Sequence, residues 1–133
     1  DWGPGVDAYP EVATRQFACD RPRPSLDERI VRRYEAQMAA GFLDEVRGLV
    51  SGSRELSRTA RQALGYRELL LHIEADVALD DALDLANQRT RRFARRQQRW
   101  FRRDPRIEWI DLEENDLDRV VEQLVGELRS WAS

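Results

Sequence analysis

The sequence predicts a mainly helical chain with two short strands that belong to a larger α/β fold. Apolar residues recur at helical spacing through most of the 133 residues. Two short stretches, residues 12–19 and 107–111, mix or alternate apolar and polar side chains as strands do. Two strands alone seldom form a stable sheet, so we expect the rest of a parallel sheet in a segment upstream of this chain.

The N-terminal part predicts a loop followed by a strand. Residues 1–11 are rich in Gly and Pro, which favour loops. The strand over residues 12–19 is followed by Pro22 and Pro24. These prolines can continue neither a strand nor a helix, because proline lacks an N–H group and has a fixed φ.

A capping box marks the first helix. Ser25 is the expected N-cap and Glu28 stands three residues later. The helix ends at Gly41, a plausible C-terminal break. Its apolar face is Leu26, Ile30, Tyr34 and Met38.

Three further helical regions precede the second strand. One ends at Gly52, the next covers residues 59–75 with an interruption at Gly65, and the longest covers residues 79–103 until Asp104-Pro105 stops it. The residues that point inward from the first of these regions are Leu43, Val46, Leu49 and Val50.

The chain is expected to end with a strand over residues 107–111 and an amphipathic helix that Asn115 caps. The apolar side of this helix is Leu117, Val120, Val121, Leu124, Leu128 and Trp131.

Positive charge is concentrated on the longest helix. Residues 88–106 contain nine Arg and one acidic residue, a balance of about +8, whereas the remaining thirteen Arg stand against twenty-four acids, a balance of −11. An apolar stripe runs along the same helix, so one face can pack on a core while its flanks meet an anion. The stripe is Ala86, Thr90, Phe93, Gln97 and Trp100, with Ala94 and Phe101 beside it. The flanking rows are Arg89, Arg92, Arg96, Arg99 and Arg103 on one side and Arg91, Arg95, Arg102 and Arg106 on the other.

Two interpretations of this charge remain open. The helix is either a solvated face neutralised by acidic helices of its own protein, or a surface for a phosphate backbone. Arg suits the second role because its planar fork binds phosphate bidentately and stacks on bases. Every cationic side chain is Arg, but a GC-rich coding bias would give the same preference.

Motifs of several familiar catalytic sites are absent from the sequence. It has no Gly-x-x-x-x-Gly-Lys-Ser/Thr loop, no Gly-x-Ser-x-Gly or His-Glu-x-x-His motif, and no run of about 20 apolar residues. With one His and one Cys, a metal site and an internal disulfide are not expected. We expect His72 to be an ordinary helix residue and Cys19 to be a small buried strand residue.

Two motifs and the spacing between them are the most specific feature of the sequence. The first is Gln62-Ala63-Leu64-Gly65-Tyr66-Arg67-Glu68-Leu69, and the second is Thr90-Arg91-Arg92-Phe93-Ala94-Arg95-Arg96-Gln97 with Trp100-Phe101-Arg102-Arg103-Asp104-Pro105. Together with Trp109-Ile110-Asp111 and the segment from Leu26 to Val46, they resemble the C-terminal half of bacterial tRNA dimethylallyltransferases, the tRNA isopentenyltransferase family. The resemblance covers residues 12–131.

The resemblance implies that residues 1–133 are a single C-terminal portion of a nucleotide-binding, P-loop-type α/β core. The family transfers a dimethylallyl group from dimethylallyl diphosphate to N6 of the adenosine 3′ of the tRNA anticodon, and it uses Mg²⁺. The family's P-loop, its Asp general base and its inserted helical domain have no counterpart in these residues. We therefore expect an inactive fragment that holds no catalytic residue and no Mg²⁺ ligand.

The resemblance also implies that both motifs approach the tRNA anticodon stem-loop, with the target base flipped out of its stack. The candidate tRNA-binding residues are Gln62, Gly65, Tyr66, Arg67, Arg95, Arg96, Gln97, Arg99, Trp100 and Arg102. We expect a cytoplasmic monomer with no membrane partner, which meets dimethylallyl diphosphate only in the full-length enzyme.

Simpler roles stand beside these candidates. Trp100 and Phe93 are expected to be core anchors rather than platforms for stacked bases. Gln97 either satisfies a buried backbone group or faces RNA, and Gly65 either permits close packing or a bend, or lets RNA approach. Tyr66 can pack with its hydroxyl at the rim. For the whole chain, the alternative is a non-catalytic helical module that binds RNA or an acidic protein.

Overall fold

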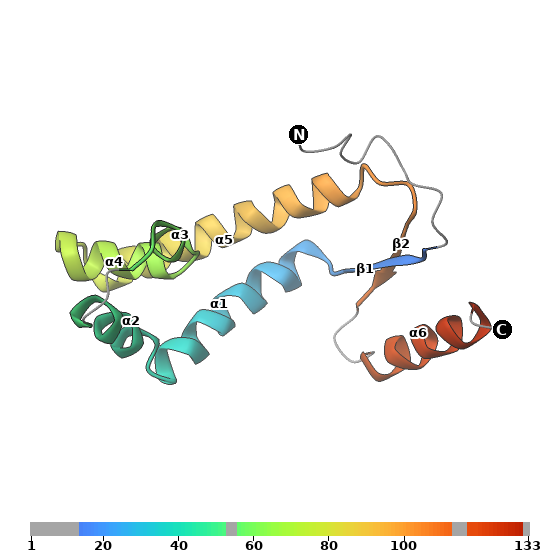
Figure 1. Ribbon diagram of the computed structural model, residues 1–133, viewed down its shortest axis with the longest axis horizontal. Helices are drawn as coiled ribbons and strands as arrows, with labels where there is room; N and C mark the ends of the chain where they lie inside the picture. The colour runs from blue at the N-terminus through green and yellow to red at the C-terminus, as the bar shows by residue number, and fades with distance from the viewer. Residues whose placement is uncertain (1–13, 53–55, 113–116, 132–133) are drawn as a thin grey trace. The chain divides into compact units, whose positions relative to one another are not determined.

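The computed structural model describes residues 14–52, 56–112 and 117–131. Figure 1 shows the expected mainly helical chain with two short strands. The elements are β1 (Gln16–Asp20), α1 (Arg23–Ala39), α2 (Phe42–Ser51), α3 (Arg58–Gln62), α4 (Tyr66–Ala75), α5 (Leu79–Phe101), β2 (Ile107–Asp111) and α6 (Leu117–Trp131). They divide into two compact units, one of residues 27–96 and one that joins residues 1–26 to residues 97–133.

The two strands pair in parallel, as expected for part of an α/β sheet. Their register runs from Gln16 opposite Ile107 to Asp20 opposite Asp111. The bounds predicted for β2 are confirmed. The first strand begins and ends later than predicted, and residues 12–13 of the predicted range lie outside the described residues.

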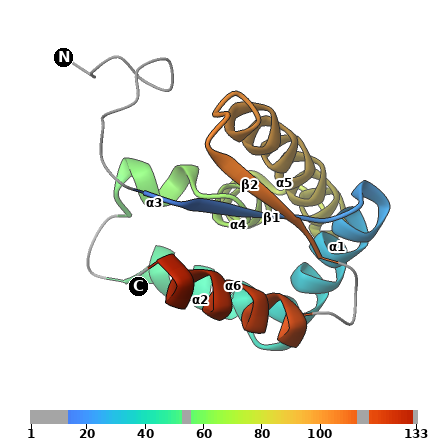
Figure 2. The same ribbon diagram turned by 90° about the vertical axis from the view of Figure 1, so that its right-hand side faces the viewer.

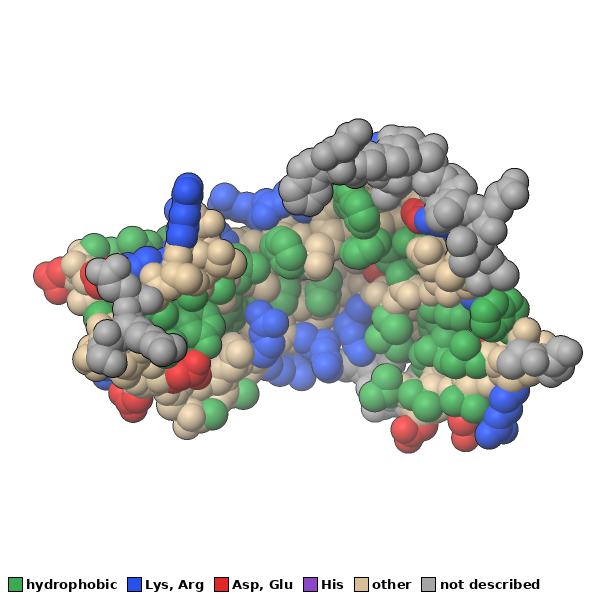
Figure 3. All heavy atoms as spheres, in the orientation of Figure 1, with side chains coloured by type: hydrophobic (Ala, Val, Ile, Leu, Met, Phe, Trp, Pro, Cys, Tyr) green, Lys and Arg blue, Asp and Glu red, His purple; other side chains and the backbone are tan. Residues whose placement is uncertain are grey.

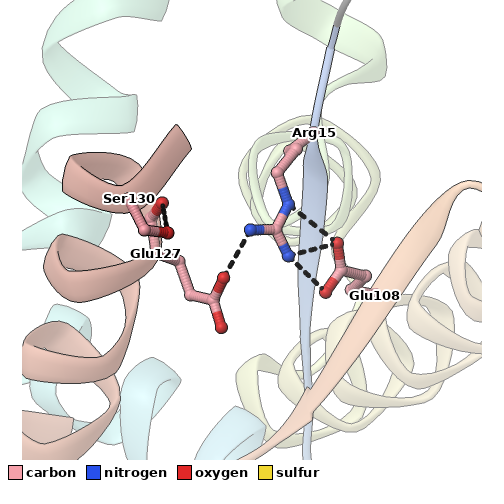
Figure 4. A network of polar contacts seen from close by, with 4 residues as sticks. All are labelled: Arg15, Glu108, Glu127 and Ser130. Carbon is pink, nitrogen blue, oxygen red and sulfur yellow. Dashed lines mark hydrogen bonds and ion pairs between the residues drawn. The ribbon is translucent and has the colours of Figure 1, made fainter. Parts of the chain in front are cut away.

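Helix α6 lies alongside the strand pair (Figure 2). Its predicted apolar side is present, but only Val120 on it is buried, and Leu117 and Leu128 are more than half exposed. The predicted cap Asn115 lies outside the described residues. Arg15 connects α6 to β2, since its guanidinium donates to Glu108 of β2 at 2.7 Å and pairs with Glu127 of α6 (Figure 4).

The prediction for the start of α1 is wrong. The helix begins at Arg23, and the N–H of Leu26 donates to the carbonyl of Pro22 at 3.0 Å. Proline is tolerated in the first helical turn because the N–H groups there have no partner within the helix. Ser25 therefore lies inside the helix, where its buried hydroxyl finds no hydrogen-bond partner among the described residues. Glu28 instead accepts from Arg32 one turn later, at 3.0 Å.

The unit of residues 27–96 has a core to which all but one of its helices contribute a buried apolar side chain. The buried hydrophobic residues are Ile30, Tyr34, Phe42, Val46, Leu69, Leu70, Ala82 and Ala86. Tyr34 joins α1 to α5 through a hydroxyl contact of 2.9 Å with Thr90. Leu49, which was predicted to point inward, is exposed.

A break at Gly65 divides the predicted helix 59–75 into α3 and α4. Ser57 caps α3 by accepting from the N–H of Ala60 at 3.2 Å. His72 is a helix residue as predicted, and its Nδ1 lies 2.8 Å from the carbonyl oxygen of Val77, just beyond the end of α4.

Two further observations concern exposure. Cys19 is exposed on β1, so the prediction that it is buried is wrong. In the described part of the chain, no helix combines the length and the apolar character needed to span a membrane.

Candidate nucleic-acid interface

The long helix α5 changes character along its length. Ala82, Ala86 and Thr90 recur every four residues and are buried. Beyond Thr90 the same stripe is open, since 41% of Phe93 and 51% of Trp100 are exposed. The expectation that these two aromatic residues are core anchors is therefore wrong in this chain.

Gln97 is exposed as well, which removes its interpretation as a partner for buried backbone. On the face drawn in Figure 3, Arg side chains lie beside hydrophobic side chains that are open to solvent. This mixture of guanidinium groups and open apolar surface differs from a merely solvated charged face.

The corner between α3 and α4 is held by close packing. Gly65 is buried with φ of +90°, and a Cβ at this position would lie 3.1 Å from ring carbons of both Tyr34 and Phe42. Close packing and a bend thus account for this glycine.

Tyr66 is fixed from two sides. Its hydroxyl donates to Glu45 of α2 at 2.5 Å, and its ring meets Phe42 edge to face, with 5.1 Å between the ring centroids. The hydrogen bond to Glu45, followed by partial burial, raises the pKa of the Tyr66 hydroxyl. The Tyr66 side chain is half-buried and its hydroxyl contact with Glu45 is exposed, which agrees with the predicted packing of the ring with the hydroxyl at the edge of the packed region.

A hollow of about 600 Å³ lies between this corner and α5, within the unit of residues 27–96. It brings together three candidate residues from the two motifs, namely Gln62, Arg67 and Arg96. We call it the arginine cleft. Its lining is completed by Leu64, Arg89, Arg92 and Phe93.

Sequence reasoning did not select these additional lining residues as site residues. The sequence did indicate Arg89 and Arg92, because they share one row of the helix surface with the candidate Arg96. Phe93 was missed because its place on the apolar stripe suggested burial.

Glu68 connects the two walls of the arginine cleft. This carboxylate is completely buried. It accepts the N–H of Gly65 at 2.8 Å and the guanidinium of Arg89 at 2.5 Å. One oxygen therefore caps α4, and the other neutralises a cation on α5.

The other cations of the arginine cleft have no such partner. Arg67, Arg92 and Arg96 form no ion pair with any described residue, and Arg96 lies 6.0 Å from the ring centroid of Phe93. Among the described residues, no acidic side chain lines the arginine cleft. Its three unpaired guanidinium groups can therefore receive an anion.

The remaining candidates do not line this hollow. Arg95 is exposed on α5 outside the cleft lining, and Gln97, Arg99 and Trp100 belong to the other unit. Arg102, also in that unit, donates to Asp20 at 2.6 Å and lies 5.0 Å above the ring of Trp109. The charge of Arg102 is thus neutralised by Asp20, an acidic residue of the same protein.

Metal ligands are not grouped in the part of the chain that the structure describes. Within residues 14–52, 56–112 and 117–131, no three His, Cys, Asp or Glu side chains lie together so that they could hold an ion.

Comparison with known proteins places both motifs in one family. The family model for IPP transferase matches residues 4–104. The chain is 41% identical over 121 residues to the tRNA dimethylallyltransferase of Nocardioides sp., covering 90% of this chain and 39% of that protein. It is 37% identical over 127 residues to the tRNA dimethylallyltransferase of Carboxydothermus hydrogenoformans, covering 95% of this chain and 40% of that protein.

Solved structures agree with this assignment. The tRNA isopentenylpyrophosphate transferase of Bacillus halodurans is 26% identical with a TM-score of 0.80, over 88% of this chain and 38% of that one. The tRNA isopentenylpyrophosphate transferase of Staphylococcus epidermidis is 26% identical with a TM-score of 0.81, over 90% of this chain and 39% of that one. This chain spans about two fifths of the length of the curated relatives that it matches. It belongs to the IPP transferase family.

Proposed function

We propose that this chain is the tRNA-facing C-terminal portion of a tRNA dimethylallyltransferase. The whole enzyme transfers the dimethylallyl group of dimethylallyl diphosphate to N6 of the adenosine 3′ of the anticodon. The arginine cleft carries the proposal. It places Arg67, from one family motif, in the same hollow as Arg96, from the other, and the part of its lining that the structure describes contains no acidic side chain.

The chemistry of this surface suits RNA. Guanidinium groups bind phosphate oxygens bidentately, and unpaired cations release counterions when a phosphate backbone replaces them. An exposed aromatic ring among them offers a surface on which an unstacked base can lie. An acidic protein would be bound by the cations alone. The alternative of an acidic-protein-binding module therefore leaves the exposed aromatic ring unexplained.

Catalysis is proposed for the longer enzyme and not for residues of this chain. From the resemblance to the family, we propose that Mg²⁺ acts in the longer enzyme with ligands outside this chain. We propose a cytoplasmic location, because the partner is tRNA and the single cysteine is free, as is usual in a reducing compartment. We also propose that the protein is a monomer.

Paired charge removals test the RNA role. Arg67→Gln with Arg96→Gln should weaken binding of an anticodon stem-loop about tenfold or more, and should make the slope of log K against log salt shallower by about 1.4 to 1.8. The matched control is Arg29→Gln with Arg58→Gln, which removes the same charge from exposed positions of the same unit outside the cleft. Equal losses in both variants would refute the assignment of RNA binding to the arginine cleft.

A further inference from the structure

We propose that the arginine cleft holds one unstacked nucleotide of the RNA, with its base on the Phe93 ring and its phosphates on Arg67, Arg92 and Arg96. This inference rests on the proposed function and assigns a base-binding role to Phe93, for which the sequence favoured a place in the core.

The exposure of Phe93 is the first observation. It follows Thr90, the last buried residue of the stripe on α5, and 41% of it is exposed inside a hollow lined mainly by polar and cationic side chains. Aromatic rings in cationic grooves bind single-stranded nucleic acid by stacking, because every base has a π face.

The arrangement of charge is the second observation. The guanidinium carbon of Arg96 lies 6.0 Å from the Phe93 centroid, at the outer limit of a cation–π contact. The Arg92 guanidinium has only a 3.4 Å contact with Gln88, and the Arg67 side chain has no partner among the described residues. Three cations thus line the same hollow as this ring and are available to the phosphates of a nucleotide whose base lies on it.

Arg89 has a different role in the same hollow. Its charge is compensated by the buried Glu68, and 28% of its side chain is exposed. It therefore forms part of the wall and is not counted among the phosphate ligands. The charge of the cleft that has no acidic partner among the described residues therefore lies on Arg67, Arg92 and Arg96.

Size also favours a single nucleotide. The hollow of about 600 Å³ lies within the usual range of roughly 300–1,000 Å³ for small-ligand sites. A hollow of this volume is large enough for one extruded nucleotide. Single-stranded loops with splayed bases are the usual targets of sequence-specific RNA binding.

A double-mutant cycle between protein and RNA tests the inference. An anticodon stem-loop is prepared intact and with an abasic residue at each loop position in turn, and its affinity for the whole chain is measured with wild type, Phe93→Leu and Phe93→Tyr. Phe93→Leu should weaken binding of the intact loop about 5- to 100-fold. Phe93→Tyr should bind like wild type, because it keeps the aromatic face.

Coupling identifies the stacked base. At one loop position, the abasic substitution and Phe93→Leu should be non-additive, so that Phe93→Leu has no further effect on that RNA. Additive losses at every position, or unchanged binding by Phe93→Leu, would overturn the nucleotide site while leaving the proposed function standing. Failure of the wild-type chain to bind the intact stem-loop would refute the proposed function itself. An acidic peptide that binds more tightly than the stem-loop and ignores Phe93→Leu would identify a protein partner instead.

Discussion

Gly65 illustrates how one residue fixes the geometry of the site. It has a positive φ and lies against two aromatic rings, so a side chain here meets both backbone strain and a steric clash. Gly41 has a similar φ of +95° but open space around its Cβ position.

We predict that Gly65→Ala lowers the free energy of unfolding by about 2–5 kcal/mol, which combines the strain of positive φ with overpacking. Gly41→Ala should lose only the conformational part, about 1–2 kcal/mol. Urea denaturation of both variants provides the comparison. Equal losses would show that the contacts with Tyr34 and Phe42 are not responsible.

The hydrogen bond between Tyr66 and Glu45 predicts a pH dependence. Since it raises the pKa of Tyr66 in the folded chain, its contribution is fully present below the unfolded pKa of about 10 and is lost as pH rises through the higher folded pKa. Tyr66→Phe should therefore cost roughly 0.5–1 kcal/mol at pH 8, and the difference from wild type should shrink above pH 10. A difference that stays constant up to pH 11.5 would contradict this account.

At the scale of elements, the sequence allowed helices and strands to be predicted better than their surroundings. The bounds of β2 and the N-terminus of α5 agree with their predictions, because alternation and helical spacing are local signals. Helix α5 ends at Phe101, two residues before the predicted end ahead of Asp104-Pro105. The N-terminus of α1 was misplaced because both Ser25 and Pro24 can begin a helix, and tertiary context decides between them.

Burial could not be predicted in the same way. Helical spacing shows that Phe93 shares a face of α5 with Thr90. It does not show how far along α5 other helices cover that face. The arginine cleft was predictable in part, because Arg67 and Arg96 carry motif signals. The contact of Glu68 with Arg89 was not, because it joins residues from different helices.

The turn between α5 and β2 depends on Asp104. Its carboxylate accepts from the backbone N–H of Arg106 at 3.0 Å and from the guanidinium at 2.7 Å, and these bonds hold the pKa of Asp104 below its usual value. A depressed pKa stabilises the fold above the unfolded value of about 3.9, and this contribution is lost as pH falls through the folded value. Asp104→Asn should thus lower the melting temperature at pH 6 but not below pH 2.5. A pH-independent difference would rule out the carboxylate as the cause.

Arg15 holds α6 against the strands by pairing with Glu108 and Glu127. We predict that Arg15→Gln accelerates amide hydrogen exchange in residues 117–131 and leaves residues 27–96 unchanged. Arg32→Gln, which breaks the exposed pair with Glu28, serves as the control. Unchanged exchange in α6 would show that its apolar contacts suffice.

At the scale of the whole molecule, a chain with net charge −3 concentrates its positive charge on one segment, since residues 88–106 contain nine Arg and one acidic residue. Buried Glu68 neutralises Arg89, Asp20 pairs with Arg102, and the arginine cleft keeps three cations without acidic partners among the described residues. This distribution, rather than net charge, is the basis of the proposed contact with an anionic partner.

The most direct test is binding of the wild-type chain to an anticodon stem-loop and to a scrambled hairpin of equal length across a salt series. We predict tighter binding of the stem-loop, with log K falling against log salt at a slope of about −2 to −3 for the three cleft cations. No binding at low salt, or equal binding of both hairpins, would contradict recognition by the arginine cleft and leave its Arg residues as a solvated face.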